Sequence, residues 1–425
     1  MPSSRGIWKP NPNEYYVLQN EPAKKGGYIQ MRLVEERYEV NYLDQFRFYA
    51  VDIPEDRQLY SEKPIFTTPF NGLSEHIHTV STEPEAPASV VHVNTGLDVS
   101  EATAVSDQDY LVLNEDRNLG FHYQKIELDL GDLSEAPQIK LLIDAMSAFP
   151  TTPAGSARIL EFGPRTMLEV LDENGDWVRV PMSTVQLPMP PEFRRPFVLD
   201  VTDIFVTDVY KVRMTFLFKT YVDSIRVDTT ADDPVTLTEL RLDNAKLRSY
   251  GHSDKTHLVD DIFEFEYNLD DPNHEHDYYP GNYTRYGNVK PLLGEVDDMF
   301  VVYGSGDEIV LRFEEPQPPR AGDKRSYVVY SNGYYKVARN LVPATVEPMP
   351  FAAMSNFPYD ETVEQYPDSR EHRRYLETYN TRREPKDRAR YMEPEAGDDG
   401  QTEPDDQAGS GRNPRKDKRR GPSGD

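Results

Sequence analysis

Short segments of this chain alternate apolar and polar residues, and this alternation limits the folds open to it more than any other feature. In KVRMTFLF (211–218), Val212, Met214, Phe216 and Phe218 fall on one side of an extended chain, with polar residues between them. A period of two is the pattern of a β-strand with one buried face. We predict strands here and at QFRFYAVDI (45–53), QKIELDL (124–130), MLEVLD (167–172), WVRVPM (177–182), FVLDV (197–201), SIRVDTT (224–230), FVVYG (300–304), EIVLRFE (308–314) and SYVVYS (326–331).

Turn signals between these segments indicate the fold class. Asn174-Gly175 and Asn332-Gly333 each lie between strand-like segments, and both residue types accept the positive φ angles of a tight hairpin turn. The sequence predicts one clear helix, at SREHRRYLETYNTR (369–382). Many strands with regular turns predict a mainly β chain of tandem β-sandwich domains with few short helices. We expect a jelly-roll-like domain at about residues 110–230.

Changes in composition divide the chain into four parts. A polar stretch at 81–108 has few aromatic residues and predicts a long loop, and Ala-Asp-Asp-Pro at 231–234 interrupts two strand patterns. Asp368 or Ser369 is the expected N-cap of the helix. Beyond about Arg383 apolar residues nearly disappear, which is typical of a disordered tail. The predicted parts are an N-terminal β domain with a long polar loop (1–108), a β-sandwich domain (109–232), a C-terminal β domain ending in a short helix (233–382) and a disordered charged tail (383–425).

Charge and cysteine content argue against several classes of function. The net charge is −27, and the last 45 residues hold 11 basic and 11 acidic residues, so the acidic excess lies in the rest of the chain. An acidic surface repels nucleic acid and anionic lipid, so neither is an expected partner. The absence of cysteine excludes disulfides, thiolate metal sites and a cysteine nucleophile. We recognise no signal peptide and no apolar run of 18 residues, which predicts no membrane insertion and a cytoplasmic location by default.

Two His-x-His pairs are candidate metal ligands. His274 and His276 would point the same way from an extended segment with Asp277 beside them, and His76 and His78 repeat the spacing. A divalent metal, zinc or calcium, is therefore the alternative to a chain without a cofactor. The other interpretation is solvated loop histidines next to acids, because no third spaced ligand accompanies either pair.

The segment from Asp172 to Asp176 resembles the opening of a calcium loop. Asp172, Asn174 and Asp176 offer alternate oxygen ligands, but Trp177 stands where such a loop requires glycine and Ser183 where it requires a bidentate glutamate. A hairpin turn is the favoured interpretation.

The densest group of aromatic and charged residues lies at 281–313. Aromatic rings beside arginine and carboxylates form surfaces for sugars or proteins, because the rings stack and the charges orient polar groups. The same residues can instead form an internal ion-pair network that holds a loop in place. The candidates for contact with a partner are Tyr283, Arg285, Tyr286, Asp297, Asp298 and Asp307.

Seven segments, taken in order, carry a resemblance to a known family. They are EVNYLDQFRFYAVDIP (39–54), GFHYQKIELDL (120–130), LEVLDENGDWVRVP (168–181), YVDSIRVDTT (221–230), GNYTRYGNVKPLLGEVDDMFVVYGSGDEIVLRF (281–313), TVEPMPFAAMSNFPY (345–359) and HRRYLETYNTR (372–382). They resemble the C-terminal β-rich region of bacterial and archaeal proteins with FG-GAP propeller repeats and an ASPIC/UnbV module, sometimes with tetratricopeptide repeats. The propeller is absent here, and Tyr221 and Tyr334 stand where that family's pattern has tryptophan. The resemblance implies a β architecture and an extracellular or cell-surface setting, but no catalytic residue.

These observations lead to one main functional prediction and two alternatives. No catalytic motif is recognised, so we expect a non-catalytic β-rich binding or structural module with a protein or glycan partner. An alternative of another class is a metal-dependent hydrolase that uses the His-x-His pairs. A third is a subunit of a larger assembly, whose partner chain would be a propeller or repeat protein.

Overall fold

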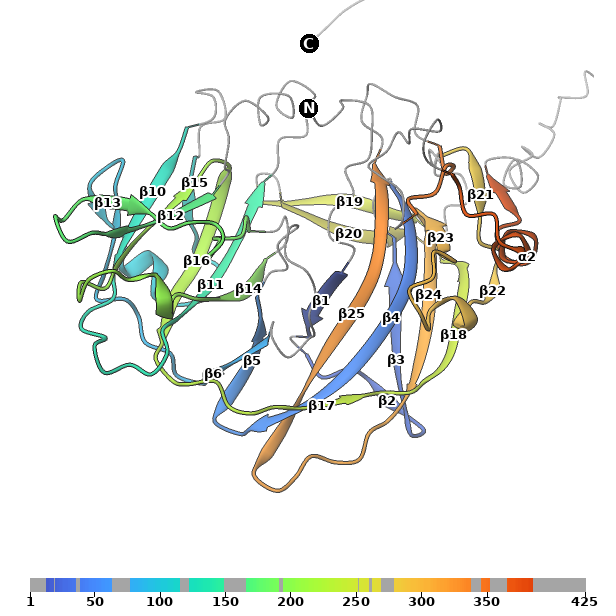
Figure 1. Cartoon of the computed structure of the whole chain (residues 1–425), viewed down its shortest axis with the longest axis horizontal. Coiled ribbons are helices and arrows are strands. Elements are labelled where there is room, and N and C mark those ends of the chain that lie inside the picture. Colours follow the sequence, from blue (N-terminus) through green and yellow to red (C-terminus); the bar gives the residue numbers. More distant parts are fainter. Residues whose placement is uncertain are drawn as a thin grey trace, which may run out of the picture.

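The computed structural model describes residues 13–18, 20–35, 39–62, 77–114, 122–148, 166–190, 194–250, 252–259, 262–268, 279–337, 345–351 and 365–384. Over these ranges the chain is mainly β, as predicted, with antiparallel strand pairs and a single α-helix. The strands form two lobes that lie side by side (Figure 1). Almost all of the predicted tail at 383–425 lies outside the described residues, which end at Glu384.

One lobe is a jelly roll, which confirms that prediction for about 110–230. Its sheet D consists of β14 (Arg195–Asp200), β11 (Lys140–Ala148), β16 (Lys219–Asp228) and β9 (Leu111–Leu113). Its sheet E consists of β13 (Trp177–Arg179), β12 (Thr166–Leu171), β15 (Lys211–Phe216), β10 (Gln124–Asp129), β7 (Ser89–His92) and β8 (Leu97–Asp98). The strands pair from the outside of the sequence inward, β9 with β16, β10 with β15, β11 with β14 and β12 with β13. This is the pattern of a long hairpin folded over into two sheets.

The polar stretch at 81–108 is not the single long loop that we expected. It contains β7, β8 and the 3₁₀ turn η2 (Glu101–Thr103). Val90 of β7 packs into the jelly-roll core opposite Leu128 of β10. A strand of four residues with one fully buried apolar side chain is too short to show a period of two, which explains why the sequence did not reveal it.

The second lobe is a sandwich of two sheets. Sheet A consists of β1 (Asn13–Val17), β25 (Asp323–Val337), β4 (Glu39–Pro54) and β17 (Thr236–Glu239), and β23 (Val301–Gly304) also pairs with β4. Sheet B consists of β2 (Lys24–Lys25), β3 (Tyr28–Val34), β24 (Asp307–Glu314), β18 (Leu242–Ser249) and β22 (Gly287–Asn288). The jelly roll is therefore inserted between β4 and β17. This grouping differs from the expected division at 1–108, 109–232 and 233–382, because β4 pairs with the distant β25 along its whole length.

The expected hairpin at Asn332-Gly333 is wrong, because both residues lie inside the continuous strand β25. The pairing register with β4 shifts between them, which marks a β-bulge. A Cβ atom on Gly333 would lie 2.7 Å from the carbonyl oxygen of Tyr42 on β4. Glycine is needed here for the close approach of two backbones rather than for a turn. The hairpin at Asn174-Gly175 is confirmed as the turn between β12 and β13.

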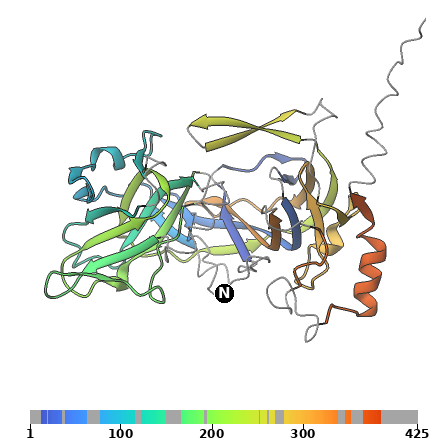
Figure 2. The same ribbon diagram turned by 90° about the horizontal axis from the view of Figure 1, so that it is seen from above.

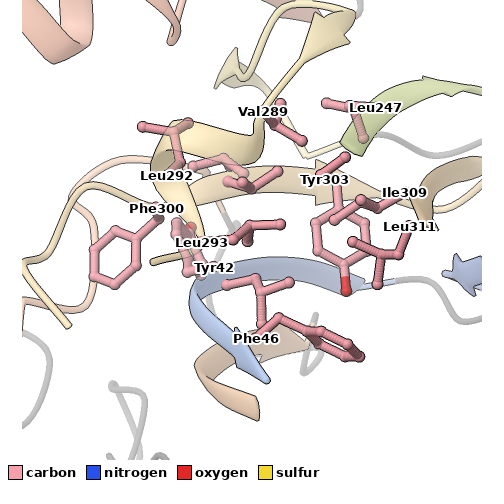
Figure 3. Close-up of a cluster of buried hydrophobic side chains, with 14 of the residues drawn as sticks. Tyr42, Phe46, Leu247, Val289, Leu292, Leu293, Phe300, Tyr303, Ile309 and Leu311 are labelled. Atoms are coloured by element: carbon pink, nitrogen blue, oxygen red, sulfur yellow. The ribbon is translucent and has the colours of Figure 1, made fainter. Parts of the chain in front are cut away.

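The core of the second lobe lies between sheets A and B. Tyr42 and Phe46 of β4, Leu311 of β24 and Leu292 of the 3₁₀ turn η5 (Lys290–Leu292) all belong to this cluster of buried side chains (Figure 3). Strands β24 and β18 contribute every second side chain to this core, as the alternation in the sequence predicts, whereas β23 buries three consecutive side chains in it. Burial of such a side chain contributes about 1.5–3 kcal/mol, so the core holds the two sheets face to face.

A two-stranded ribbon joins the lobes. It consists of β5 (Arg57–Ser61) and β6 (Ile77–Ser81). On one side of the ribbon Leu59 and Ile77 join an apolar cluster with sheet A. On the other side Tyr60 and Val80 pack against Leu142 and Val198 of sheet D. Each sandwich thus covers one outer sheet face with the ribbon and leaves its other sheet, B or E, facing away.

The remaining elements extend from the second lobe. They are the hairpin β19 (His252–Val259) and β20 (Ile262–Asn268), the pair β21 (Gly281–Tyr283) and β26 (Arg382–Glu384), and α2 (Arg370–Thr378). The 3₁₀ turn η4 (Thr202–Ile204) belongs to the jelly roll. The β19–β20 hairpin stands to one side of both lobes (Figure 2). Ser369 is the N-cap of α2, since its Oγ accepts the backbone N–H of His372 at 2.9 Å. Within the described ranges no helix has the length and apolar character needed to cross a membrane.

Candidate functional site

Three of the six residues predicted at 281–313 meet around a cation that the sequence did not point to, Arg382. Its Nη2 lies 2.6 Å from Oδ2 of Asp307, and its Nη1 donates to the hydroxyl of Tyr286 at 2.9 Å. The guanidinium also lies over the rings of Tyr283 and Tyr286, 5.2 and 4.2 Å from their centres. Asp307 and Tyr283 are fully buried, whereas Tyr286 is 38% exposed. These residues anchor β26 to the sandwich.

The other three predicted residues lie apart from this network. Arg285 donates from Nε to the carbonyl of Thr378 at the end of α2, at 2.8 Å. The backbone N–H groups of Asp297 and Asp298 donate to the carboxylate of Asp44, at 3.2 and 3.1 Å. Burial raises the pKa of Asp44 to about 7, although these two hydrogen bonds oppose the shift.

The described contacts of the 281–313 cluster therefore correspond to an internal ion-pair network, the second of the two interpretations of this cluster, rather than to a partner-binding surface. They tie α2 and β26 to the sandwich body. A role in partner binding stays a prediction for these residues, and Tyr286 is the one whose ring reaches the surface to a substantial extent.

Of the five predicted metal ligands, the structure describes His78 alone. His76, His274, His276 and Asp277 lie outside the described residues. Nδ1 of His78 lies 2.8 Å from Asp232, and its Nε2 lies 3.4 Å from Glu62. Burial opposes protonation of His78, but these two carboxylates outweigh it and raise its pKa to about 9. A protonated imidazole has no lone pair for a metal, and no group of three or more potential ligands is found within the described ranges.

His78 belongs instead to a polar network that fixes the ribbon to sheet D. At its centre is Lys140, which is completely buried. Its Nζ lies 3.0 Å from Asp228 and 3.1 Å from Asp232, and donates to the carbonyl of Thr79 on β6. A buried cation with two carboxylates is a structural anchor, since the loss of either partner leaves an uncompensated charge away from water.

The contacts at Asp172 support the hairpin interpretation of this segment. Oδ1 of Asp172 accepts the backbone N–H groups of Asn174 and Asp176, both at 2.9 Å. Gly175 has a φ angle of +81°, which the turn requires. The carboxylate holds its own turn together, as is common for aspartate at this position.

The outer face of sheet B, which we call the B face, carries more cations than carboxylates. Ile29, Leu247 and Leu311 point into the core, so their neighbours along each strand point outward. The charged residues on the outward side are the cations Lys25, Arg32, Lys246, Arg248 and Arg312 and the carboxylates Asp243, Glu308 and Glu314. Five cations against three carboxylates make this face positive in a chain whose net charge is −27.

A buried carboxylate fixes two of these cations. Glu308 is completely buried, and Arg248 and Arg32 approach it from the strands on either side. Their own side chains remain 47% and 54% exposed. Glu308 therefore holds the guanidinium of Arg248 by a hydrogen bond, while that of Arg32 lies 3.9 Å away without one, and both keep hydrogen-bond donors available to a ligand.

Tyrosine rings support two of the arginines. Arg312 lies 4.7 Å from the ring centre of Tyr28, and Arg32 lies 5.6 Å from that of Tyr250. Cation–π contact limits the freedom of these long side chains. Lys25 and Lys246 form no ion pair with the described residues.

Comparisons with known proteins add no family to this description. No family model matches the chain, and no curated protein matches it. Two solved structures are matched. One, titled "Structure of infectious bursal disease virus Gt strain", has 6% identity and a TM-score of 0.14, with 89% of this chain and 90% of that chain covered. The other, of the Gx strain, has 8% identity and a TM-score of 0.10, with 78% and 82% covered.

Proposed function

We propose that this chain is a non-catalytic binding module that recognises an acidic protein or glycan partner through the B face. The observation that carries the proposal is the cation excess of this sheet face in a strongly acidic chain. Guanidinium groups present planar pairs of donors that match carboxylate or sulfate oxygens, so arginine suits such a partner.

The dimensions of the face define the partner further. From Glu308 to Glu314 the face extends over six residue steps of β24, or about 20 Å at ~3.4 Å per residue. Outside this face the chain is acidic and repels a long polyanion. The partner we expect therefore concentrates its negative charge in a short stretch. This also separates the proposal from duplex nucleic acid, whose charge continues along its whole length.

The experiment measures the binding of two fluorescent probes to the full chain by titration. One probe is a decapeptide of glutamate, and the other is a short oligogalacturonate. We expect at least one to bind, and the substitutions Lys25→Glu and Lys246→Glu together to weaken it tenfold or more, which corresponds to about 1.4 kcal/mol. The matched control makes the same change of charge away from the B face, with Arg179→Glu on sheet E and Arg374→Glu on α2, both at exposed positions.

The outcomes separate the alternatives. Preference for one probe identifies the partner class as protein or glycan. Equal weakening by the B-face pair and by the control pair would show that only the total charge matters. Failure of both probes to bind would overturn the proposal.

A further inference from the structure

The described part of the chain ends beside the B face. The last strand, β26, pairs with β21 in the register that places Arg382 opposite Tyr283. Arg382 forms its ion pair with Asp307, the first residue of β24. The next residue along β24 is Glu308, at one end of the B face. The described chain therefore ends close to the Asp307 end of β24.

An acidic segment follows after a short spacer. Residues 393–406 contain seven carboxylates and no lysine or arginine. Eight residues, 385–392, separate this segment from Glu384. An extended chain spans at most ~3.3–3.6 Å per residue, so the spacer reaches about 30 Å. The acidic segment can therefore reach any part of a face that is about 20 Å long.

Among the described sheet faces, charge favours the B face as the destination of this segment. The excess of carboxylates lies in residues 1–380, and it repels seven further carboxylates from most of the surface. The B face is the described sheet face with an excess of cations. In Glu393-Pro394-Glu395 and in Glu403-Pro404-Asp405, a proline disfavours the helical conformation for the residue before it. Two acids separated by one residue match the two-residue spacing of outward positions on a strand.

We propose that the acidic segment 393–406 binds the B face of its own chain and occupies it until an external acidic partner displaces it. The covalent connection makes this contact far easier than contact between separate molecules, since two groups joined by a short stretch of chain meet at an effective concentration on the order of millimolar. The inference goes beyond the proposed function, because it gives the face an occupant that the chain itself supplies.

The absence of cysteine allows a direct test by disulfide cross-linking in the full chain. Ala396→Cys places one thiol in the acidic segment. It is combined either with Val310→Cys, at an outward position in the middle of the B face, or with Glu377→Cys, an exposed position on α2. Position 377 is closer to position 396 along the chain than position 310 is. If the segment did not bind the B face, it would therefore cross-link to position 377 at least as fast as to position 310. We expect the pair 396/310 to cross-link at least tenfold faster than the pair 396/377 at low ionic strength.

Two further measurements test whether the cross-linking preference depends on charge. At 1 M salt the screening length falls to about 3 Å, and the tenfold preference should shrink to about twofold or less. Replacement of the seven carboxylates of 393–406 by amides should have the same effect. Asn244→Cys, exposed on the same face, replaces Val310→Cys if that variant folds poorly. Equal rates at low salt, or a preference that neither salt nor amides reduce, would overturn the inference. No external probe is present, so failure of the proposed function leaves this result unaffected.

Discussion

The two sandwiches expose one sheet face each, and these faces differ in how they balance charge. On the outer face of sheet E, which we call the E face, cations and carboxylates form pairs, two of them between the neighbouring strands β15 and β10 and one that reaches across β15 from β10 to β12. The pairs are Lys125 with Glu169 at 2.9 Å, Lys211 with Asp129 at 3.0 Å and Arg213 with Glu127 at 3.0 Å. On the B face cations outnumber carboxylates. Two sheets of similar construction thus differ at outward positions, which shows that the side chains on a fold, and not the fold, point to a binding role.

The two faces also differ in how they hold their charges. The carboxylates of the E-face pairs are partly exposed, so water and salt screen these pairs and each is worth little. Glu308 on the B face is completely buried and depends on Arg32 and Arg248 for compensation. The B face therefore fixes its cations, whereas the E face merely neutralises them.

The largest expected effect tests this difference in anchoring. Replacement of Arg32 and Arg248 together by alanine should lower the free energy of unfolding by about 3 kcal/mol, because it leaves the buried Glu308 without a cation. The matched E-face pair of substitutions, Lys125→Ala with Lys211→Ala, should together cost about 1 kcal/mol, because each removes a partly exposed ion pair. Urea unfolding measures both. Adding Glu308→Gln to the double variant should restore part of the loss, and no recovery would show that the buried charge is not the cause.

The next effect concerns His78, in the ribbon that both sandwiches share. Its folded-state pKa of about 9 lies above the ordinary value of 6.5, so the folded chain binds the proton more tightly than the unfolded chain. The resulting stabilisation is complete below pH 6.5 and is lost as the pH rises through 9. We expect His78→Asn to lower stability by about 2 kcal/mol at pH 6 and to have little further effect above pH 10. Urea unfolding from pH 6 to 10 measures this. A difference that does not vary with pH would mean that packing, and not charge, is lost.

A third prediction compares the same dipeptide in the two sandwiches. Asn-Gly is a hairpin turn at Gly175 in the jelly roll and a bulge at Gly333 in the second lobe. Gly333→Ala should cost about 2 kcal/mol, because its Cβ would approach the backbone of Tyr42 and the strands would have to shift. Gly175→Ala meets no atom within 4 Å and should cost about 1 kcal/mol for its positive φ angle alone. Thermal unfolding of both variants decides whether the two glycines serve different purposes. Equal losses would contradict the close approach at Gly333.

The same pair of glycines shows how far sequence can predict this structure. Strands with one buried face were predicted, since alternation records that burial directly. Strand β11 was missed because both of its faces are buried, with Leu141 and Ile143 in the jelly-roll core and Leu142 against the ribbon, so no period of two remains. Whether Asn-Gly turns or bulges depends on a partner strand far away in the sequence, which local residues do not record.

The candidate site shows the same limit. The aromatic and acidic residues around 281–313 were visible as a group, but Arg382, which gathers three of them, lies 75 residues from Asp307. The B face was not predicted, because its cations come from β2, β3, β18 and β24 and become neighbours only when these strands pair. An excess of cations on one sheet face depends on which strands are neighbours. The net charge is a sum over the whole chain and does not reveal such a local excess.

The smallest expected effect asks whether the E face is inert. Trp177 lies 4.0 Å from the guanidinium of Arg213 and is the large aromatic side chain of this face. Trp177→Ala should lower the free energy of unfolding by about 1 kcal/mol, the usual size of an exposed cation–π contact together with a partly buried ring. It should leave the affinity for both acidic probes unchanged, because Arg213 keeps its ion pair with Glu127. Probe titration and urea unfolding of this one variant test both statements. If Trp177→Ala weakened probe binding as much as the Lys25→Glu, Lys246→Glu pair, the E face would also bind, and charge excess would not be what distinguishes the two sandwiches.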